Sequence, residues 1–100
     1  MIMTRDYFNK HTRVALQFRT PDGGKFWEYS CPDNVENHIR YMELERGCTF
    51  LCEDYDKFQE DPYIKNFLNM LAYNHKYHKR YKEMSFASVL NLALDAEIDI

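Results

Sequence analysis

The sequence of 100 residues lacks the segments that direct a chain to a membrane. Residues 1–6 contain no apolar run of the kind found in a secretory signal peptide. No stretch approaches the roughly 20 apolar residues that a bilayer-spanning helix needs. The three cysteines are odd in number, and without a secretory signal they favour reduced thiols over a disulfide framework. We therefore expect a soluble, cytoplasmic protein without a membrane partner.

The sequence also lacks the motifs of common catalytic and cofactor-binding sites. Residues 22–24 (Asp-Gly-Gly) lack the Lys-Ser or Lys-Thr ending of a phosphate-binding loop, and they fit a turn better. The acidic residues of segment 53–61 lack the spaced ligands, central glycine and closing glutamate of an EF-hand. No segment resembles a thiol-enzyme signature. These absences predict a protein that is not an enzyme and carries no cofactor.

Charge is unevenly distributed along the chain. The net charge of −3 is by itself too small to indicate a nucleic-acid binder. Residues 33–61 hold nine acidic and three basic side chains, whereas residues 62–84 hold five basic side chains and one acidic one. Such asymmetry can steer a partner, or it can be satisfied internally if the two segments pack together.

Two runs of residues alternate between apolar and polar side chains, which is the pattern of half-buried strands. They cover residues 12–19 and 25–31, and the Pro-Asp-Gly-Gly sequence between them, at 21–24, is typical of a turn. The apolar face of the first run consists of Val14, Leu16 and Phe18. The pattern predicts a β-hairpin, whose apolar face must be covered because a lone hairpin is marginal in water.

The second run leaves open which of its faces is turned to the core. We expect Trp27 to pack against a helix in the core. If the opposite face is turned inward, Trp27 and Tyr29 form a surface patch instead. The short apolar run at residues 48–52 also has two interpretations: it is either a third strand that completes a small sheet or a buried turn of helix.

Helical patterns occupy much of the remaining chain. A short helix is expected over residues 4–10. A second begins at Asp33 as its N-cap, carries an apolar stripe, and ends at Gly47. Asp61 followed by Pro62 predicts the start of a long helix that reaches about residue 83. The last helix is predicted to begin at Ser85 as its N-cap.

Together these elements predict a single α+β domain over residues 1–100. The predicted architecture is a β-hairpin, or a three-stranded antiparallel sheet, packed against three to four helices. We find no internal repeat, linker or low-complexity segment that would divide the chain.

The most distinctive stretch is rich in tyrosine and basic residues near the end of the long predicted helix. Tyrosines spaced four residues apart would form one aromatic stripe there, with basic side chains beside it. Such a surface suits an acidic protein partner or a nucleic acid, although a solvated helix end is the simplest interpretation. We call this candidate partner-binding site the basic tyrosine segment, and it comprises Tyr73, Lys76, Tyr77, Lys79, Arg80, Tyr81 and Lys82.

Two cysteines and two histidines with short internal spacings are candidate ligands for a metal ion. Three residues separate Cys48 from Cys52, and two residues separate His75 from His78. The 22 residues between the pairs exceed the spacing of zinc-finger motifs. A buried cysteine commonly acts as a small hydrophobe, and both histidines fall on the apolar stripe of their helix. We therefore predict no metal site.

These observations favour a non-enzymatic protein-interaction module that binds a larger protein or ribonucleoprotein or that forms a homo-oligomer. In size, charge and lack of motifs the chain is similar to small phage-encoded inhibitors of host machinery, including anti-CRISPR proteins, which implies action by occlusion of a surface. One alternative is a small nucleic-acid-binding regulator that uses the basic tyrosine segment. A second alternative is a small thiol or zinc-dependent protein.

Overall fold

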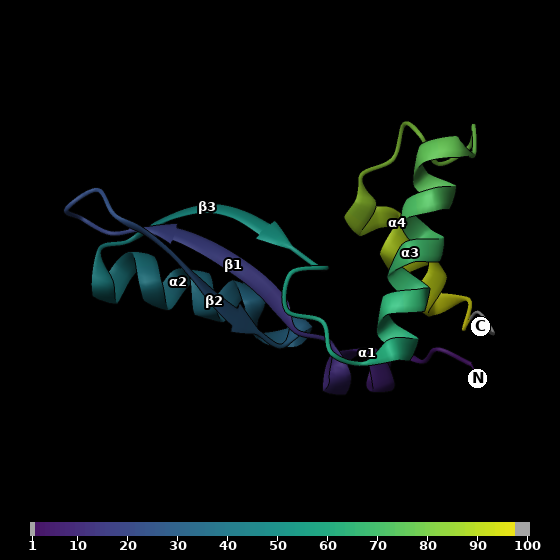
Figure 1. Ribbon diagram of the computed structural model, residues 1–100, viewed down its shortest axis with the longest axis horizontal. Helices are drawn as coiled ribbons and strands as arrows, with labels where there is room; N and C mark the ends of the chain where they lie inside the picture. Colours follow the sequence, from purple (N-terminus) through teal and green to yellow (C-terminus); the bar gives the residue numbers. More distant parts are fainter. Residues whose placement is uncertain (1, 98–100) are drawn as a thin grey trace. The chain divides into compact units, whose positions relative to one another are not determined.

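The computed structural model describes residues 2–97, which fall into two compact units (Figure 1). The sheet unit is His11–Gln59. The helical unit combines residues 2–10 with residues 60–97. Within the described residues the chain forms one three-stranded antiparallel sheet, four α-helices and a 3-10 turn, so the predicted α+β class is confirmed.

The predicted hairpin is confirmed. Strands β1 (Val14–Arg19) and β2 (Lys25–Ser30) pair antiparallel, with Arg19 opposite Lys25 next to the turn. The turn closes with a hydrogen bond of 2.8 Å from the Thr20 amide to the Gly24 carbonyl. Gly23 has a φ of 94°, which glycine adopts without steric cost.

The run at 48–52 proves to be part of a third strand. Strand β3 (Thr49–Asp54) pairs antiparallel with β1, which makes β1 the central strand in the order β2-β1-β3. The register of this pair shifts between Gln17 and Phe18, as at a β-bulge. The sheet therefore has three strands, which is the minimum that is usually stable with one apolar face covered.

Helix α2 (Val35–Arg46) supplies this cover. It follows a 3-10 turn at Pro32–Asn34. The core beneath it consists of Val14, Leu16, Phe18, Met42 and Cys48, with the half-buried side chains of Phe26, Val35, Ile39, Phe50 and Tyr55 around them. The apolar stripe predicted for this helix is thus the part that packs on the hairpin.

The two ends of α2 differ in how far the sequence predicted them. Gly47 ends the helix as expected, in the left-handed conformation with a φ of 65°. Its amide donates to the Met42 carbonyl, a common way to close a helix. The predicted N-cap at Asp33 is wrong, because the chain first makes the 3-10 turn and Asn34 then occupies the cap position without a side-chain hydrogen bond.

The helical unit buries the apolar faces of its helices within one core. It contains α1 (Arg5–His11, of which His11 belongs to the sheet unit), α3 (Pro62–Tyr77) and α4 (Phe86–Asp95). The buried side chains are Met3, Phe8, Ile64, Phe67, Leu68, Leu71, Val89, Leu90, Ala93 and Leu94. The rings of Phe8 and Phe67 meet edge to face at 5.9 Å, which joins the N-terminal helix to α3.

The start of each long helix in this unit is capped as predicted. The Asp61 carboxylate accepts hydrogen bonds from the amides of Tyr63 (2.8 Å) and Ile64 (3.3 Å), and Pro62 occupies the first helical position. Ser85 accepts a hydrogen bond of 3.1 Å from the Ser88 amide. These caps satisfy amides that have no partner within their helices.

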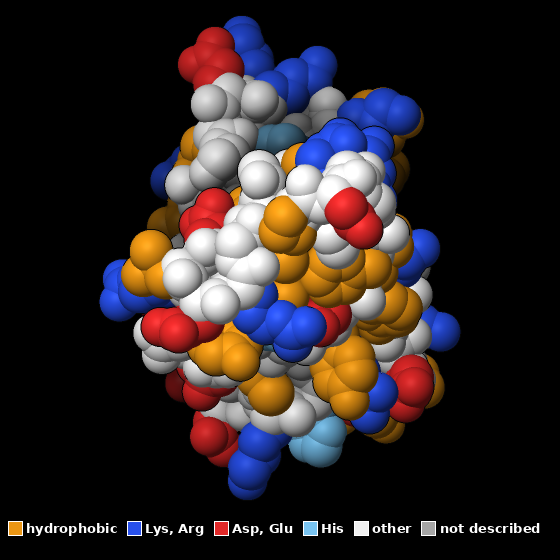
Figure 2. Space-filling model, turned by 90° about the vertical axis from the view of Figure 1, so that its left-hand side faces the viewer, with side chains coloured by type: hydrophobic (Ala, Val, Ile, Leu, Met, Phe, Trp, Pro, Cys, Tyr) orange, Lys and Arg blue, Asp and Glu red, His pale blue; other side chains and the backbone are white. Residues whose placement is uncertain are grey.

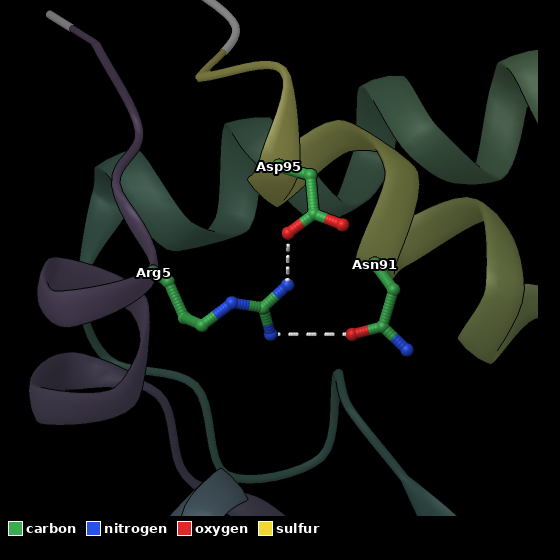
Figure 3. A network of polar contacts seen from close by, with 3 residues as sticks. All are labelled: Arg5, Asn91 and Asp95. Carbon is green, nitrogen blue, oxygen red and sulfur yellow. Dashed lines mark hydrogen bonds and ion pairs between the residues drawn. The ribbon is translucent and has the colours of Figure 1, made fainter.

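An exposed polar network also links α1 to α4 (Figure 3). The Arg5 guanidinium donates to the Asp95 carboxylate at 2.7 Å and to the Asn91 side-chain oxygen at 3.2 Å. The Arg5 and Asp95 side chains are 45% and 70% exposed, so solvent screens the pair. Pairs of this kind contribute at most about 1 kcal/mol to stability, so the apolar core holds the unit together.

Candidate functional site

The first two tyrosines of the basic tyrosine segment lie side by side on the last turns of α3. Tyr73 and Tyr77 are 65% and 60% exposed, and their ring centroids are 4.9 Å apart. The ammonium group of Lys76 lies 5.2 Å from the Tyr77 centroid, within cation–π range. Two large aromatic side chains and a cation are therefore presented to solvent on one part of the helix.

Tyr81 is placed differently from the prediction. We predicted that α3 reaches about residue 83 and that Tyr81 continues the stripe, but α3 ends at Tyr77 and the backbone of His78 is extended. Tyr81 lies in the following turn, half-buried, with its ring centroid 4.8 Å from that of His78. The predicted three-tyrosine stripe is therefore wrong: only Tyr73 and Tyr77 share it.

The turn after α3 is fixed by several hydrogen bonds. The carbonyl of His78 accepts from the amides of Tyr81 (2.9 Å) and Lys82 (3.1 Å). The His75 ring nitrogen Nε2 lies 2.7 Å from the carbonyl oxygen of Met84, which ties the end of the turn back to α3. His75 also meets Phe86 edge to face, with 6.0 Å between the ring centroids. This histidine therefore has a structural role at the reversal between α3 and α4.

The basic side chains of the segment are exposed around this turn. Lys76, Lys79, Arg80 and Lys82 are all exposed. The guanidinium carbon of Arg80 lies 5.8 Å from the Tyr81 centroid. Within the described part of the chain, residues 2–97, the ion pairs are formed by side chains other than these four. The C-terminal end of α3 also favours nearby cations through the helix dipole, so positive charge is concentrated around this turn.

An apolar hollow adjoins the segment. It lies between the last turns of α3, the following turn and α4. The residues that line it are Leu71, Asn74, Tyr81, Val89, Leu92, Ala93 and Ala96. Sequence reasoning missed this hollow because it assigned Tyr81 to a helical stripe rather than to a wall between two helices.

A second aromatic and basic surface lies on the face of the sheet opposite α2. Trp27 pairs with Gln17, one residue out of phase with Phe18 and Phe26, which face α2. The expectation that Trp27 packs against a helix is therefore wrong. Trp27 is half-buried, and its ring is covered by the Lys57 ammonium group at 4.7 Å.

Tyr29 lies on the same face of the sheet as Trp27. Its ring has the Arg13 guanidinium at 5.0 Å and the Phe58 ring at 6.3 Å. Lys57 and Phe58 belong to the loop after β3, which folds back over this face. The cations of this surface, Arg13 and Lys57, therefore lie over aromatic rings of their own unit.

Further exposed apolar side chains of the sheet unit lie three positions apart on α2, so they share one side of that helix. Tyr41 and Leu44 on α2 are 54% and 75% exposed. On the face drawn in Figure 2, hydrophobic side chains lie among Lys and Arg and among Asp and Glu side chains, without a broad field of one charge. Exposed apolar residues are normal on protein surfaces and do not by themselves indicate a site.

The four candidate metal ligands have separate environments. Cys48 is buried in the core of the sheet unit, and Cys52 is exposed on β3 near Gln17. In the helical unit, His75 contacts Met84 and His78 contacts Tyr81. Across residues 2–97, no group of three His, Cys, Asp or Glu side chains is arranged to hold a metal ion.

Groups with shifted pKa values occupy structural positions. A hydrogen bond of 2.6 Å to the Asp61 carboxylate raises the pKa of Tyr7 to about 12. Burial, together with the Glu53 carboxylate, raises the pKa of Tyr55 to about 12. In the hairpin turn, a hydrogen bond from the Thr20 hydroxyl lowers the pKa of Asp22. The three groups lie in a helix cap, beside a core and in a turn, and they do not converge on one site.

Comparison of the chain with protein-family models, with curated proteins and with solved structures finds no match. None of the helices within residues 2–97 combines the length and apolar character required to cross a membrane. The candidate site therefore rests on the geometry of the chain itself.

Proposed function

We propose that this chain is a non-enzymatic interaction module that docks the basic tyrosine segment on an acidic surface of a larger protein or ribonucleoprotein. The observation that carries this proposal is the concentration of exposed cations around an exposed tyrosine pair at the end of α3 and on the following turn, which hydrogen bonds fix. Tyrosine and arginine are enriched among the side chains that dominate binding energy at protein interfaces.

The charge distribution supports the acidic character of the partner. Cations at the rim of an interface raise the association rate toward a surface of opposite charge and disfavour basic competitors. A small chain without a catalytic motif can act by covering the surface it binds. We propose this mode of action, as an inhibitor of host machinery of the phage-encoded or anti-CRISPR type, for the chain as a whole.

A charge-reversal pull-down tests the proposal. Tagged wild-type protein and the double variant Lys79→Glu with Arg80→Glu are used to capture partners from lysate, with and without nuclease treatment. The matched control, Lys10→Glu with Lys25→Glu, changes net charge equally at exposed positions outside the segment. We expect one stoichiometric protein partner that survives nuclease and is lost only with the first variant.

Two outcomes would contradict the proposal. Recovery of nucleic acid alone, with binding that falls steeply as salt is added, would replace it with a nucleic-acid-binding regulator. Equal loss of the partner in both double variants would show that net charge, rather than this segment, governs binding.

A further inference from the structure

We propose that the apolar hollow beside the basic tyrosine segment receives one large apolar side chain from an acidic segment of the partner. This inference rests on the proposed function and names the chemistry of what binds. The hollow and the cations belong to the same compact unit, so their arrangement is defined within that unit.

The interior of the hollow suits an aliphatic or aromatic group. Its walls are mainly the hydrocarbon side chains of α3 and α4, namely Leu71, Val89, Leu92, Ala93 and Ala96. Leu92 is 48% exposed, so part of the apolar wall remains in contact with water. Filling such a hollow removes apolar surface from water on both partners, which favours binding.

The charge at the rim of the hollow indicates which partner residues can lie next to the inserted apolar side chain. Tyr81 forms one wall, and the Arg80 guanidinium lies 5.8 Å from its ring. Asn74, on another wall, precedes Tyr77 by three residues and therefore lies on the same side of α3. A segment that enters the hollow on the Tyr81 side passes Arg80, so a carboxylate next to its apolar side chain complements this part of the rim.

The hollow is preorganised for binding, because the wall that contains Tyr81 is held in place by hydrogen bonds. The contact of 2.7 Å between His75 Nε2 and the Met84 carbonyl holds the turn that carries Tyr81. Ser85 caps α4 directly after this turn and sets where that helix begins. A wall fixed in this way reduces the ordering that binding requires, which raises affinity.

The test uses a synthetic peptide of aspartate and glutamate with one central leucine, and a second peptide in which alanine replaces that leucine. Binding is measured by NMR titration of the isotope-labelled chain. In Ala96→Leu, a larger side chain fills the hollow from an exposed position at the end of α4. The matched control is Ala87→Leu, also exposed on α4 but outside the residues that line the hollow.

We expect the leucine peptide to shift the methyl resonances of Leu71, Val89 and Leu92. The alanine peptide should bind about tenfold more weakly or worse, because truncating an apolar group in a fitted cavity commonly costs this much. Ala96→Leu should weaken the leucine peptide by a similar factor, and Ala87→Leu should leave it unchanged. Unaltered melting temperatures of both variants would show that the fold is retained.

Other results would overturn the inference. Equal binding of the two peptides, or failure of either to bind, would show that the hollow does not recognise an apolar side chain. A homodimer that is lost in Ala96→Leu and excludes the peptide would assign the hollow to a second copy of the chain. If the lysate partner depends on Lys79 and Arg80 but tolerates Ala96→Leu, the proposed function stands and this inference fails. If that partner is indifferent to the charge reversal, the proposed function itself fails.

Discussion

The position of Lys57 over Trp27 predicts how the fluorescence of the single tryptophan responds to charged quenchers. The perturbation is Lys57→Gln, which removes a positive charge located 4.7 Å from the Trp27 ring. Because the lysine is exposed and lies in a loop, we expect this change to leave the fold intact. Iodide, an anion, should quench Trp27 less efficiently in the variant than in the wild type.

The magnitude follows from the distance. In water, a unit charge at this separation enriches a monovalent anion about fourfold, and physiological salt reduces the enrichment to about twofold. Neighbouring acidic side chains are the same in both proteins, so their effect cancels in the ratio. We therefore expect the iodide quenching constant to fall about twofold in Lys57→Gln.

The assay compares iodide with acrylamide at constant total ionic strength. Acrylamide is neutral, so its quenching constant should differ little between the proteins. Arg46→Gln serves as the control, because it removes the same charge at the end of α2, the helix on the opposite face of the sheet. The iodide and acrylamide quenching constants of this control should equal those of the wild type.

Two results would refute the reasoning. Equal iodide constants for the wild type and Lys57→Gln would show that the lysine does not cover the ring. A tryptophan that acrylamide cannot reach in the wild type would place Trp27 in the core, as the sequence first indicated, and would contradict the orientation of β2.

Further predictions concern stability and ionisation. Leu16→Ala removes most of a fully buried side chain from the central strand and should lower the free energy of unfolding by about 2–5 kcal/mol. Its control, Leu44→Ala, changes a 75% exposed position and should alter that free energy by less than about 0.5 kcal/mol. Urea titrations measure both values. Gly47→Ala should cost about 1 kcal/mol, because alanine is strained at positive φ, and the melting temperature should fall while Gly47→Asn recovers part of the loss. Equal stability of Gly47→Ala and wild type would argue against the left-handed helix end. Because Tyr7 has a pKa raised to about 12, its contribution to stability is complete below the unfolded value of about 10 and is lost as pH rises toward 12. Asp61→Asn should move the ultraviolet titration of Tyr7 to lower pH, and an unmoved transition would exclude the hydrogen bond as its cause.

Local signals in the sequence predicted much of the fold. The Pro-Asp-Gly-Gly turn between two alternating runs specified the hairpin, because each residue type favours that turn for its own stereochemical reason. Gly47, Asp61 and Ser85 marked helix ends through interactions with nearby backbone groups. Such signals act over a few residues, so they can be recognised without knowledge of the tertiary structure.

The candidate site was only partly predictable, because its geometry depends on contacts between distant segments. No glycine or proline marks the end of α3 at Tyr77, and the reversal is instead fixed by the contact between His75 and Met84. Residue alternation alone does not decide whether Phe26 or Trp27 faces the core. The register with β1 decides it by placing Phe26 opposite Phe18. Lys57 reaches Trp27 only because the loop after β3 folds back, which periodicity does not indicate.

The contacts of Phe8 and Gln59 have a consequence for the order in which the chain folds during synthesis. The side chain of Gln59 donates to the Arg13 carbonyl and accepts from the Arg13 amide, so the first and last parts of the sheet unit are fastened together once residue 59 has emerged. Phe8 is made much earlier, yet its core partner Phe67 belongs to a helix that is translated later. We therefore expect the sheet unit to fold on the ribosome before the helical unit, while the apolar side chains of α1 stay exposed to chaperones until α3 has been made.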